Sequence, residues 1–476
     1  MTVSWTPRLG RPSESDPRLG TLHEQILEAL RRDISSGELP PGARLPTHRE
    51  LAHTLGIGIG TVTKAYGEAE RAGLVTSRVG RGSFVAGPEP EGRQGPHSEG
   101  LIDLTMNLQA LGPAASRLGE SLARLRRRTD LEDHVGLPPQ AGFAWQRRAF
   151  AEWLASAVRY EGLDWRRLII CAGAQQAMAL ALDEIARPGD TILAEAATFH
   201  GMKVLAAYRG HPLLGLPMDR EGLSPEALDR AAAESGARIL YVQPTLQNPT
   251  ARSMSRARRE AVAAIVRRRG LFVIEGDVYG PLAHAGWGSD ESRALVPLAS
   301  LVPERVFYVG GLSKALAPGL RVGFLVAPDA ARFERLCLAM RAVSYAAPAF
   351  GPLIAAQWVG DGTAETILAE VSREAASRIA LATAILGERL ETPSAPTSLH
   401  AWLPLGELEA ERLVGSALRQ GVVLASPSLL TISRQEASGL RLCLGAPAER
   451  TRLDRALRII ASILGNEVEA PVASVI

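Results

Sequence analysis

Short apolar segments alternate with helical patterns from residue 101 onward, and this alternation limits the possible folds more than any other feature. The segments are rich in Ile, Val and Leu, which is typical of strands buried on both faces of a parallel sheet. Helical patterns such as those at 174–187 and 255–269 separate them. The sequence therefore predicts an α/β layered domain with a mostly parallel sheet. The predicted strands lie in RLIICAG (167–173), TILAEA (191–196), RILYVQP (238–244), LFVIEGD (271–277), RVFYVGG (305–311) and RVGFLVAP (321–328).

This α/β body is expected to span residues 101–465 in two lobes. The larger lobe covers about 101–330. A helical stretch then leads into the strand-like segments LHAWLPL, GVVLAS and LRLCLGAP, which predicts a smaller α+β lobe over 331–465. In front of the body, residues 88–100 hold Pro, Gly and charged residues with almost no apolar side chain. We expect that segment to be a flexible linker.

A small separate module precedes the linker, over residues 19–87. Apolar residues from Leu22 to Ile34 recur at a four-residue step and predict an amphipathic helix, which a Pro-Pro-Gly cluster stops. A short helix around Arg49–Leu55, a turn at Gly56 and a second helix over about 60–72 then form a helix-turn-helix pattern. The next segment, LVTSRVGRGSFVAG, alternates and folds back at GRG, so we expect a two-stranded wing.

The second helix of such a pair fits a DNA major groove about 12 Å wide, with its N-terminal residues at the base edges. Arginines beside the helices and on the wing are suited to phosphates or the minor groove. Residues 1–87 carry eleven Lys and Arg against nine Asp and Glu, so charge alone supports nucleic-acid binding only weakly. A three-helix protein–protein module with solvated arginines is the alternative. The predicted DNA-binding residues are Arg44, Arg49, Thr61, Thr63, Lys64, Arg78 and Arg81.

The module resembles the winged helix-turn-helix of the GntR regulator family. The resemblance rests on PPGARLPTHRELAHTLGIGIGTVTKAYGEAERAGLV and GRGSFV and covers the whole module. It implies that the module binds double-stranded DNA. Family members usually carry a polar, often arginine-containing triplet before the recognition Thr-Val, whereas this chain has Gly58-Ile59-Gly60. One base or phosphate contact of the family is therefore expected to be absent, and the operator to differ.

In open α/β sheets, ligands bind at the carboxyl ends of the strands. Gly173-Ala174-Gln175 begin a helix after the first predicted strand, where free N–H groups and the helix dipole favour a phosphate. Phe199 offers an aromatic ring, and Asn248 offers an amide. Taken singly, each has an ordinary structural role, such as a core ring or a turn-forming amide. The other candidates at strand ends or beginnings are Asp277, Tyr279, Ser313, Lys314, Arg321 and Arg441.

Lys314 is notable because the chain holds only three lysines among its 53 Lys and Arg residues. Arginine can replace a solvated lysine, but it does not form an imine with a carbonyl. A phosphate cup, a stacking ring, donors to a phenolic oxygen and an amine together suit a planar phosphorylated aldehyde. The set predicts pyridoxal 5'-phosphate as cofactor, with Lys314 as its Schiff-base residue.

Residues 101–465 resemble a fold-type I aminotransferase domain through GAQQAM, QNPT, DVYG and SKALAPGLRVG. The resemblance implies that Lys314 forms the Schiff base and that Phe199 stacks on the cofactor ring. Phosphate binding falls to Ser313, Arg321 and the backbone at Gly173–Gln175. The ring oxygen is implied to contact Asn248 and Tyr279. Arg441 is implied to clamp the carboxylate of an amino acid, a bidentate task that suits a guanidinium.

Two positions depart from the aminotransferase pattern. The family usually has Asp three residues before the tyrosine, paired with the pyridine nitrogen, whereas this chain has Gly276 there and Asp277 one residue later. Strand side chains alternate between faces, so either the loop shifts to bring Asp277 in, or catalysis is reduced while cofactor binding persists. Gly311 stands where a hydroxyl residue is common, so we expect one phosphate contact to be lost.

A GntR-type module joined to an aminotransferase-like body resembles the MocR regulators across nearly the whole chain. This implies a transcription regulator that holds pyridoxal phosphate and senses an amino acid, another amine or a B6 vitamer, with the effector displacing the Lys314 link. Fold-type I sites lie at a dimer interface, so a homodimer and repeated or palindromic half-sites are expected. A working aminotransferase with an auxiliary DNA-binding module is the alternative, and a regulator that has lost the cofactor is a third possibility.

Cys171, Cys337 and Cys443 are far apart in sequence, which fits a reducing cytoplasm without a disulfide framework, and no ligand-spaced Cys/His cluster suggests metal. The N-terminal residues lack the apolar core of a signal peptide. No uncharged apolar run is long enough to span a bilayer. We therefore expect a cytoplasmic protein with no metal and no membrane contact.

Overall fold

The computed structural model describes residues 5–7, 20–36, 38–40, 43–71, 74–78, 82–85, 100–110, 112–288, 295–432 and 438–466. Contacts divide the chain into two units, Met1–Glu99 and Gly100–Ile476, and each is considered by itself. Of the expected linker, only Gly100 is among the described residues.

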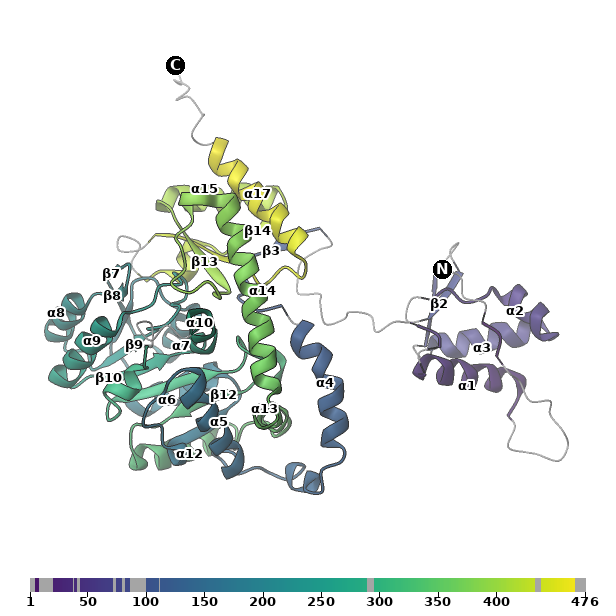
Figure 1. Ribbon diagram of the computed structural model, residues 1–476, viewed down its shortest axis with the longest axis horizontal. Coiled ribbons are helices and arrows are strands. Elements are labelled where there is room, and N and C mark those ends of the chain that lie inside the picture. Colours follow the sequence, from purple (N-terminus) through teal and green to yellow (C-terminus); the bar gives the residue numbers. More distant parts are fainter. Residues whose placement is uncertain are drawn as a thin grey trace, which may run out of the picture. The chain divides into compact units, whose positions relative to one another are not determined.

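In its described residues the first unit folds into three helices followed by an antiparallel strand pair (Figure 1). Thr47 and Glu50 form a reciprocal capping box that starts the second helix, and Gly56 ends it with a φ of 65°. This is the winged helix-turn-helix that the sequence predicted. The elements are α1 (Leu22–Ser35), α2 (His48–Leu55), α3 (Ile59–Arg71), β1 (Val75–Arg78) and β2 (Gly82–Val85).

The core of the first unit comes from one apolar face of each helix. Ile26 and Leu30 of α1 are fully buried, as are Val62 and Ala65 of α3. Leu51 of α2 joins the same cluster. Burial of these faces leaves the N-terminal turns of α3 at the surface, where Ile59 is 50% exposed. An exposed α3 start is what DNA reading by this helix requires.

A seven-stranded sheet forms the centre of the second unit, in the order β4-β12-β11-β10-β9-β5-β6 within the described residues. All neighbouring pairs are parallel except the two made by β12. The α/β architecture with a mostly parallel sheet is thereby confirmed. The strands are β4 (Leu168–Cys171), β5 (Ile192–Glu195), β6 (Leu213–Leu216), β9 (Ile239–Val242), β10 (Phe272–Gly276), β11 (Val306–Gly311) and β12 (Gly323–Val326).

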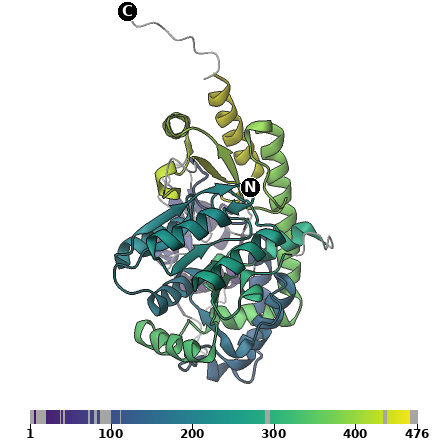
Figure 2. The ribbon, with the colours of Figure 1, turned by 90° about the vertical axis from the view of Figure 1, so that its left-hand side faces the viewer.

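Helices cover both faces of this sheet (Figures 1 and 2). Successive strand residues alternate between the two core clusters, as Leu240 and Tyr241 do on β9. One face packs on α6 (Ala174–Ile185), α7 (His200–Arg209) and α12 (Ala330–Val343). The other packs on α5 (Ala144–Ala157), α8 (Pro225–Ser235), α9 (Arg256–Arg269), α10 (Gly280–Trp287), α11 (Leu298–Leu301) and α13 (Phe350–Gly360).

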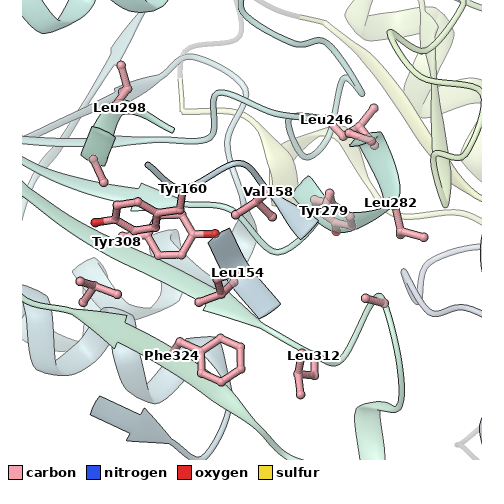
Figure 3. Packing of buried hydrophobic residues seen from close by; sticks show 14 of the residues in the cluster. Leu154, Val158, Tyr160, Leu246, Tyr279, Leu282, Leu298, Tyr308, Leu312 and Phe324 are labelled. Atoms are coloured by element: carbon pink, nitrogen blue, oxygen red, sulfur yellow. The ribbon is translucent and has the colours of Figure 1, made fainter. Parts of the chain in front are cut away.

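Aromatic rings fill the face of the sheet that packs on α5 (Figure 3). The rings of Tyr160 and Tyr308 lie 4.9 Å apart, and those of Phe150 and Phe324 are separated by the same distance. Tyr279 belongs to the same cluster and is 2% exposed.

The smaller lobe packs α14 (Thr363–Leu386), α15 (Glu407–Arg419) and α17 (Arg450–Asn466) on short strands. β13 (His400–Pro404) pairs with β15 (Gly439–Cys443) in an antiparallel manner. β14 (Val422–Val423) pairs with β3 (Ile102–Asp103), so the beginning of the body joins the smaller lobe. The sequence had placed it in the larger lobe. A two-residue strand has too short a pattern to identify its partner.

The remaining elements connect these layers. They are α4 (Gly112–Leu125), α16 (Pro427–Leu430), the strands β7 (Met218–Asp219) and β8 (Gly222–Leu223), and the 3-10 turns Leu131–His134, Trp165–Arg167, Pro318–Leu320 and Gly387–Arg389.

Candidate functional site

A cup of backbone N–H groups forms where β4 passes into α6. Gly173 has a φ of 88°, which favours glycine, and a Cβ there would lie 2.5 Å from Arg321 Nη2. A Cβ at Gly323 would lie 2.6 Å from the backbone nitrogen of Ala174, so β12 must also be bare at this point. Arg321 Nη2 donates to the Ala172 carbonyl oxygen over 3.3 Å. A helix N-terminus next to a guanidinium suits a phosphate group.

The loop after β11 runs beside this cup. A Cβ at Gly311 would lie 3.8 Å from the nitrogen of Ala174, and Ser313 follows two residues later as a half-buried residue. The side chain of Gln175 points elsewhere, because its Nε2 donates to the Gly201 carbonyl oxygen over 2.9 Å. Gln175 can therefore contribute only its backbone N–H, and not its side chain, to a phosphate at the first turn of α6.

Lys314 lies at the same edge of the sheet, with its amine enclosed by protein. Its Nζ donates to the main-chain oxygen of Asn107, a residue from the segment that follows β3. Burial lowers the pKa of Lys314 to about 8, and the cations Arg441 and Arg321 act in the same direction. A lysine in this environment is far more often a neutral nucleophile near pH 7 than a solvated lysine is.

A hydrogen-bond network joins the two lobes around Tyr279. The Tyr279 hydroxyl accepts from Asn107 Nδ2 over 2.8 Å and from Asn248 Nδ2 over 3.2 Å. Asn107 Nδ2 also lies 2.9 Å from His400 Nδ1, and His400 Nε2 lies 3.0 Å from the Gln247 carbonyl oxygen. Burial lowers the pKa of His400 to about 3, so the ring is neutral and donates from Nε2. The network thus fixes Tyr279 and Asn248 next to each other.

Arg441 reaches this network from β15 of the smaller lobe. Its Nη1 donates to Asn248 Oδ1 over 2.8 Å, and its Nη2 donates to the Thr105 carbonyl oxygen over 2.7 Å. The residue is 2% exposed, and its buried Nε has no hydrogen-bond partner among the described residues. Neither of these two hydrogen bonds goes to a carboxylate. A buried guanidinium without an anion favours binding of a carboxylate from outside the chain.

Phe199 and His200 stand at the start of α7. Phe199 is half-buried on the face of the sheet that packs on α6, and its ring lies 4.7 Å from the His200 ring. Burial lowers the pKa of His200 to about 4, with further effects from the cations Arg441 and Lys314. His200 therefore belongs electrostatically to the same site.

The Asp277 side chain points away from the position that Gly276 leaves without a side chain. Its Oδ2 accepts from the Tyr308 hydroxyl over 3.1 Å, on the α5 face of the sheet. Gly276, one residue earlier, faces Tyr241 and Gln243 on the other side. Strand alternation separates the two residues, and the contact with Tyr308 places Asp277 Oδ2 on the α5 face. That Asp277 binds the cofactor stays a prediction.

On the first unit, most of the expected DNA-contacting side chains lie at the surface. Arg44, Arg49, Thr63 and Lys64 are exposed, and Thr61 is half-buried. Thr63 Oγ1 also lies 3.2 Å from His48 Nδ1, which links α3 to α2. Arg81 and the side chain of Arg78 lie outside the described residues.

The sequence interpretation missed four residues of the body site. Asn107 and His400 support Tyr279, while Tyr241 and Gln243 face Gly276. Asn107 lies in a short loop segment without a strand pattern, so no periodicity could have identified it. His400 is a polar residue in the otherwise apolar LHAWLPL, which is the one signal that was available.

Two further features of the described residues bear on function. They contain no group of three or more His, Cys, Asp and Glu side chains arranged to hold a metal ion. Within the same part of the chain, no helix combines the length and apolar character needed to cross a bilayer.

Known proteins with the same two domains resemble this chain. The model "Bacterial regulatory proteins, gntR family" matches residues 22–85, and "Aminotransferase class I and II" matches residues 114–460. The chain is 26% identical to the uncharacterized HTH-type transcriptional regulator YdfD of Bacillus subtilis, over 87% of this chain and 90% of the relative. It is 30% identical to the vitamin B6 salvage pathway transcriptional repressor PtsJ of Salmonella typhimurium, over 68% and 72% of the two chains.

Among solved structures, the α-aminoadipate aminotransferase LysN of Thermus thermophilus, complexed with N-(5'-phosphopyridoxyl)-L-leucine, matches with a TM-score of 0.68. The identity is 26%, and the match covers 78% of this chain and 94% of that chain. The chain therefore belongs to the class I and II aminotransferase family, and the gntR-family DNA-binding domain in front of that body makes it a protein of the MocR type.

Proposed function

We propose that this protein is a DNA-binding transcription regulator whose body holds pyridoxal phosphate and uses it to sense an amino compound or a B6 vitamer. The observation that carries this proposal is the enclosed amine of Lys314, which Asn107 links to Tyr279, in a chain whose first unit is a winged helix-turn-helix with an exposed α3 start. Lysine is scarce in this sequence, and this one lies among the side chains that a phosphorylated aldehyde needs.

The residues at the sheet edge fit the cofactor group by group. The N–H groups of Gly173–Gln175 with Ser313 and Arg321 would hold the phosphate, since Gly173 and Gly323 keep the cup free of side chains. Asn248 and Tyr279 would contact the ring oxygen, and Phe199 would lie against the ring. When bound, the cofactor supplies an aldehyde carbon for which Lys314 and an incoming amine compete.

Arg441 would select effectors that carry a carboxylate. Its two terminal nitrogens already bond to Asn248 and Thr105, which orients the guanidinium, and its Nε has no partner in the part of the chain that the structure describes. An amino acid carries both groups that this site would bind: its carboxylate would pair with Arg441, and its amine would compete with that of Lys314. The role of the Salmonella relative in vitamin B6 salvage makes B6 vitamers the second effector class.

We expect the regulator to act as a homodimer. The spacing of the operator half-sites tests whether the front modules are exchanged between the protomers. Large apolar side chains are exposed on the body, including Val135, Leu137 and Tyr208 at 75%, 78% and 79%. Contact between two protomers would remove such side chains from water. Sedimentation of the purified chain tests the dimer, and a two-fold dimer would select repeated or palindromic half-sites from random DNA.

Replacing Arg441 by Lys is expected to weaken carboxylate effectors selectively. Lysine keeps the charge but loses the planar fork, and one charge-assisted hydrogen bond is worth about 1.5–3 kcal/mol, or about 10–100-fold in affinity. Spectral titration with an amino acid and with the amine that lacks its carboxylate measures the effect. The control is Arg378→Lys, which changes a buried arginine that donates to the Leu444 and Pro447 carbonyl oxygens. Equal losses for both ligands would contradict the assignment.

Attachment of pyridoxal phosphate to the apoprotein should speed up as pH rises towards 8. The attacking amine must be neutral, and the pKa of Lys314 is lowered to about 8 by burial. Below that pH the neutral fraction, and hence the rate, should fall about tenfold per pH unit, and above it the rate should level off. Stopped-flow absorbance measures the rate. A rate that still climbs tenfold per unit above pH 9 would indicate a solvated lysine.

The function as a whole is tested by a spectral titration of the purified protein with amines, amino acids and B6 vitamers, repeated with DNA present. Spectral changes that depend on effector and that alter DNA binding support a sensor. Sustained turnover of amino acid and keto acid pairs would favour the aminotransferase alternative instead. If the wild type shows no cofactor absorbance band, or shows one that persists in Lys314→Ala, a body that has lost the cofactor would be favoured.

A further inference from the structure

The bare position Gly276 faces two neutral polar side chains. A Cβ there would lie 3.2 Å from the Tyr241 hydroxyl oxygen and 3.5 Å from Gln243 Nε2. Tyr241 is fully buried, and its hydroxyl has no hydrogen-bond partner among the described residues. Gln243 is 4% exposed, and its Oε1 accepts from the Asn248 backbone nitrogen over 3.2 Å. The Tyr241 O–H and the Gln243 amide N–H thus lie at the position where aminotransferases usually have a carboxylate.

The neighbouring carboxyl groups all lie on the other face of the sheet. Asp277 bonds to Tyr308. Glu275 accepts from the backbone nitrogens of Leu298 and Ala299 over 2.8 and 2.9 Å. Glu195 accepts from Gln247 Nε2 over 3.2 Å.

Strand register explains this separation. Tyr241 pairs with Ile274 on β10 and with Ala194 on β5, so Gly276 shares the face of Tyr241, while Glu275 and Glu195 point the opposite way. Arg259, the cation nearest to Glu275 and Asp277, also belongs to that opposite face, where its Nη2 donates to Thr245 Oγ1 over 2.8 Å.

We propose that Tyr241 and Gln243 bind the cofactor by donating hydrogen bonds to an unprotonated pyridine nitrogen, directly or through one water molecule. The proposal rests on the proposed function, because it requires bound pyridoxal phosphate. A carboxylate stabilises a protonated ring nitrogen by its charge, and two neutral groups in a buried position do not. Donors instead favour the nitrogen that keeps its lone pair.

The consequence for function is that the body binds an amine without consuming it. A protonated ring nitrogen strengthens the electron sink that amino transfer needs. Without it, an effector amino acid would occupy the site of Lys314 and leave as the same amino acid. A sensor needs this property, because an effector that is converted cannot report its own concentration.

The direct test is the nitrogen-15 chemical shift of holoprotein loaded with pyridoxal phosphate labelled at the ring nitrogen. We expect the wild-type resonance at the neutral-pyridine end of the range, and Tyr241→Phe should move it further towards free pyridine because one donor is lost. A wild-type resonance at the pyridinium end would overturn the proposal while leaving the proposed function intact. Protein that retains no labelled cofactor would overturn the proposed function, and this proposal with it.

Gly276→Asp should restore the missing charge. The new Cβ needs a shift of a few tenths of an ångström by the Tyr241 hydroxyl and Gln243, and Gly276→Asp with Tyr241→Phe relieves it. Both variants should move the resonance to the pyridinium end.

They should also raise single-turnover amino transfer about a hundredfold, with the amino group and two electrons passing to the cofactor and the amino acid leaving, after hydrolysis, as its 2-oxo acid. Gly415→Asp adds the same carboxylate on α15 in the smaller lobe, where a Cβ meets only the end of the Arg419 side chain, and is the control, with no shift expected. A neutral resonance in both Gly276→Asp variants would also contradict the proposal.

Discussion

Borohydride reduction of the pyridoxal-phosphate-loaded protein is expected to fix the cofactor on Lys314 and on neither of the other two lysines. The enclosed amine of Lys314 has its pKa lowered to about 8 by burial, so about a tenth of it is neutral at pH 7. A lysine with the ordinary value is neutral there in fewer than about one molecule in a thousand. Peptide mass mapping after reduction identifies the labelled residue, and Lys314→Ala should lose the label completely.

The chain provides its own controls because it has only three lysines. Lys203 Nζ donates to the Ser428 and Thr431 carbonyl oxygens, each over 2.7 Å, so Lys203→Arg should keep the label on Lys314. Lys64 is exposed on α3, in the other unit. A label that stays in Lys314→Ala, or that appears on Lys203, would remove the basis of the sensing scheme.

Loss of Arg49 and Lys64 is expected to have the second large effect, on DNA affinity. Both side chains are exposed, Arg49 in the first turn of α2 and Lys64 on α3, where they can reach phosphates. The double variant Arg49→Ala/Lys64→Ala should bind a random-sequence duplex about 100-fold more weakly at low salt. The slope of log affinity against log salt should fall by about two, because two fewer counterions are released. Fluorescence anisotropy over a salt series measures both quantities.

A matched control removes the same charge from the body. Arg373→Ala/Arg412→Ala changes two exposed arginines of α14 and α15 and should leave affinity and slope nearly unchanged. If both double variants lose affinity equally, net charge rather than the front module governs binding. If neither loses affinity, the three-helix protein–protein alternative would be favoured.

The layered fold was predictable because its signals are local. The strands of the body are short apolar runs that end in glycine or polar residues, and helical periodicity separates them. The winged helix-turn-helix has capping residues such as Thr47 and a helix-ending Gly56, which are also read from neighbouring residues. The β3–β14 pair was not predictable, because two residues carry no period and their partner is more than three hundred residues away.

The site residues that follow strands were predictable from the sequence, whereas the contacts between the two lobes were not. Lys314, Asn248 and Tyr279 follow recognisable strands or motifs, whereas Asn107 reaches Tyr279 from a loop outside the sheet. The orientation of Asp277 also needed coordinates. Alternation left two possible orientations, and the hydrogen bond from the Tyr308 hydroxyl places the Asp277 side chain on the α5 face of the sheet.

The state of Lys314 is expected to control how the front module binds DNA. The most direct measurement is the affinity of the full chain for a duplex selected from a random library, with and without pyridoxal phosphate and an amino acid, in wild type and in Lys314→Arg. The variant keeps a cation but cannot form an imine. We predict that the additions change the affinity of the wild type and not that of Lys314→Arg. The same response in both proteins, or none in the wild type, would contradict the account.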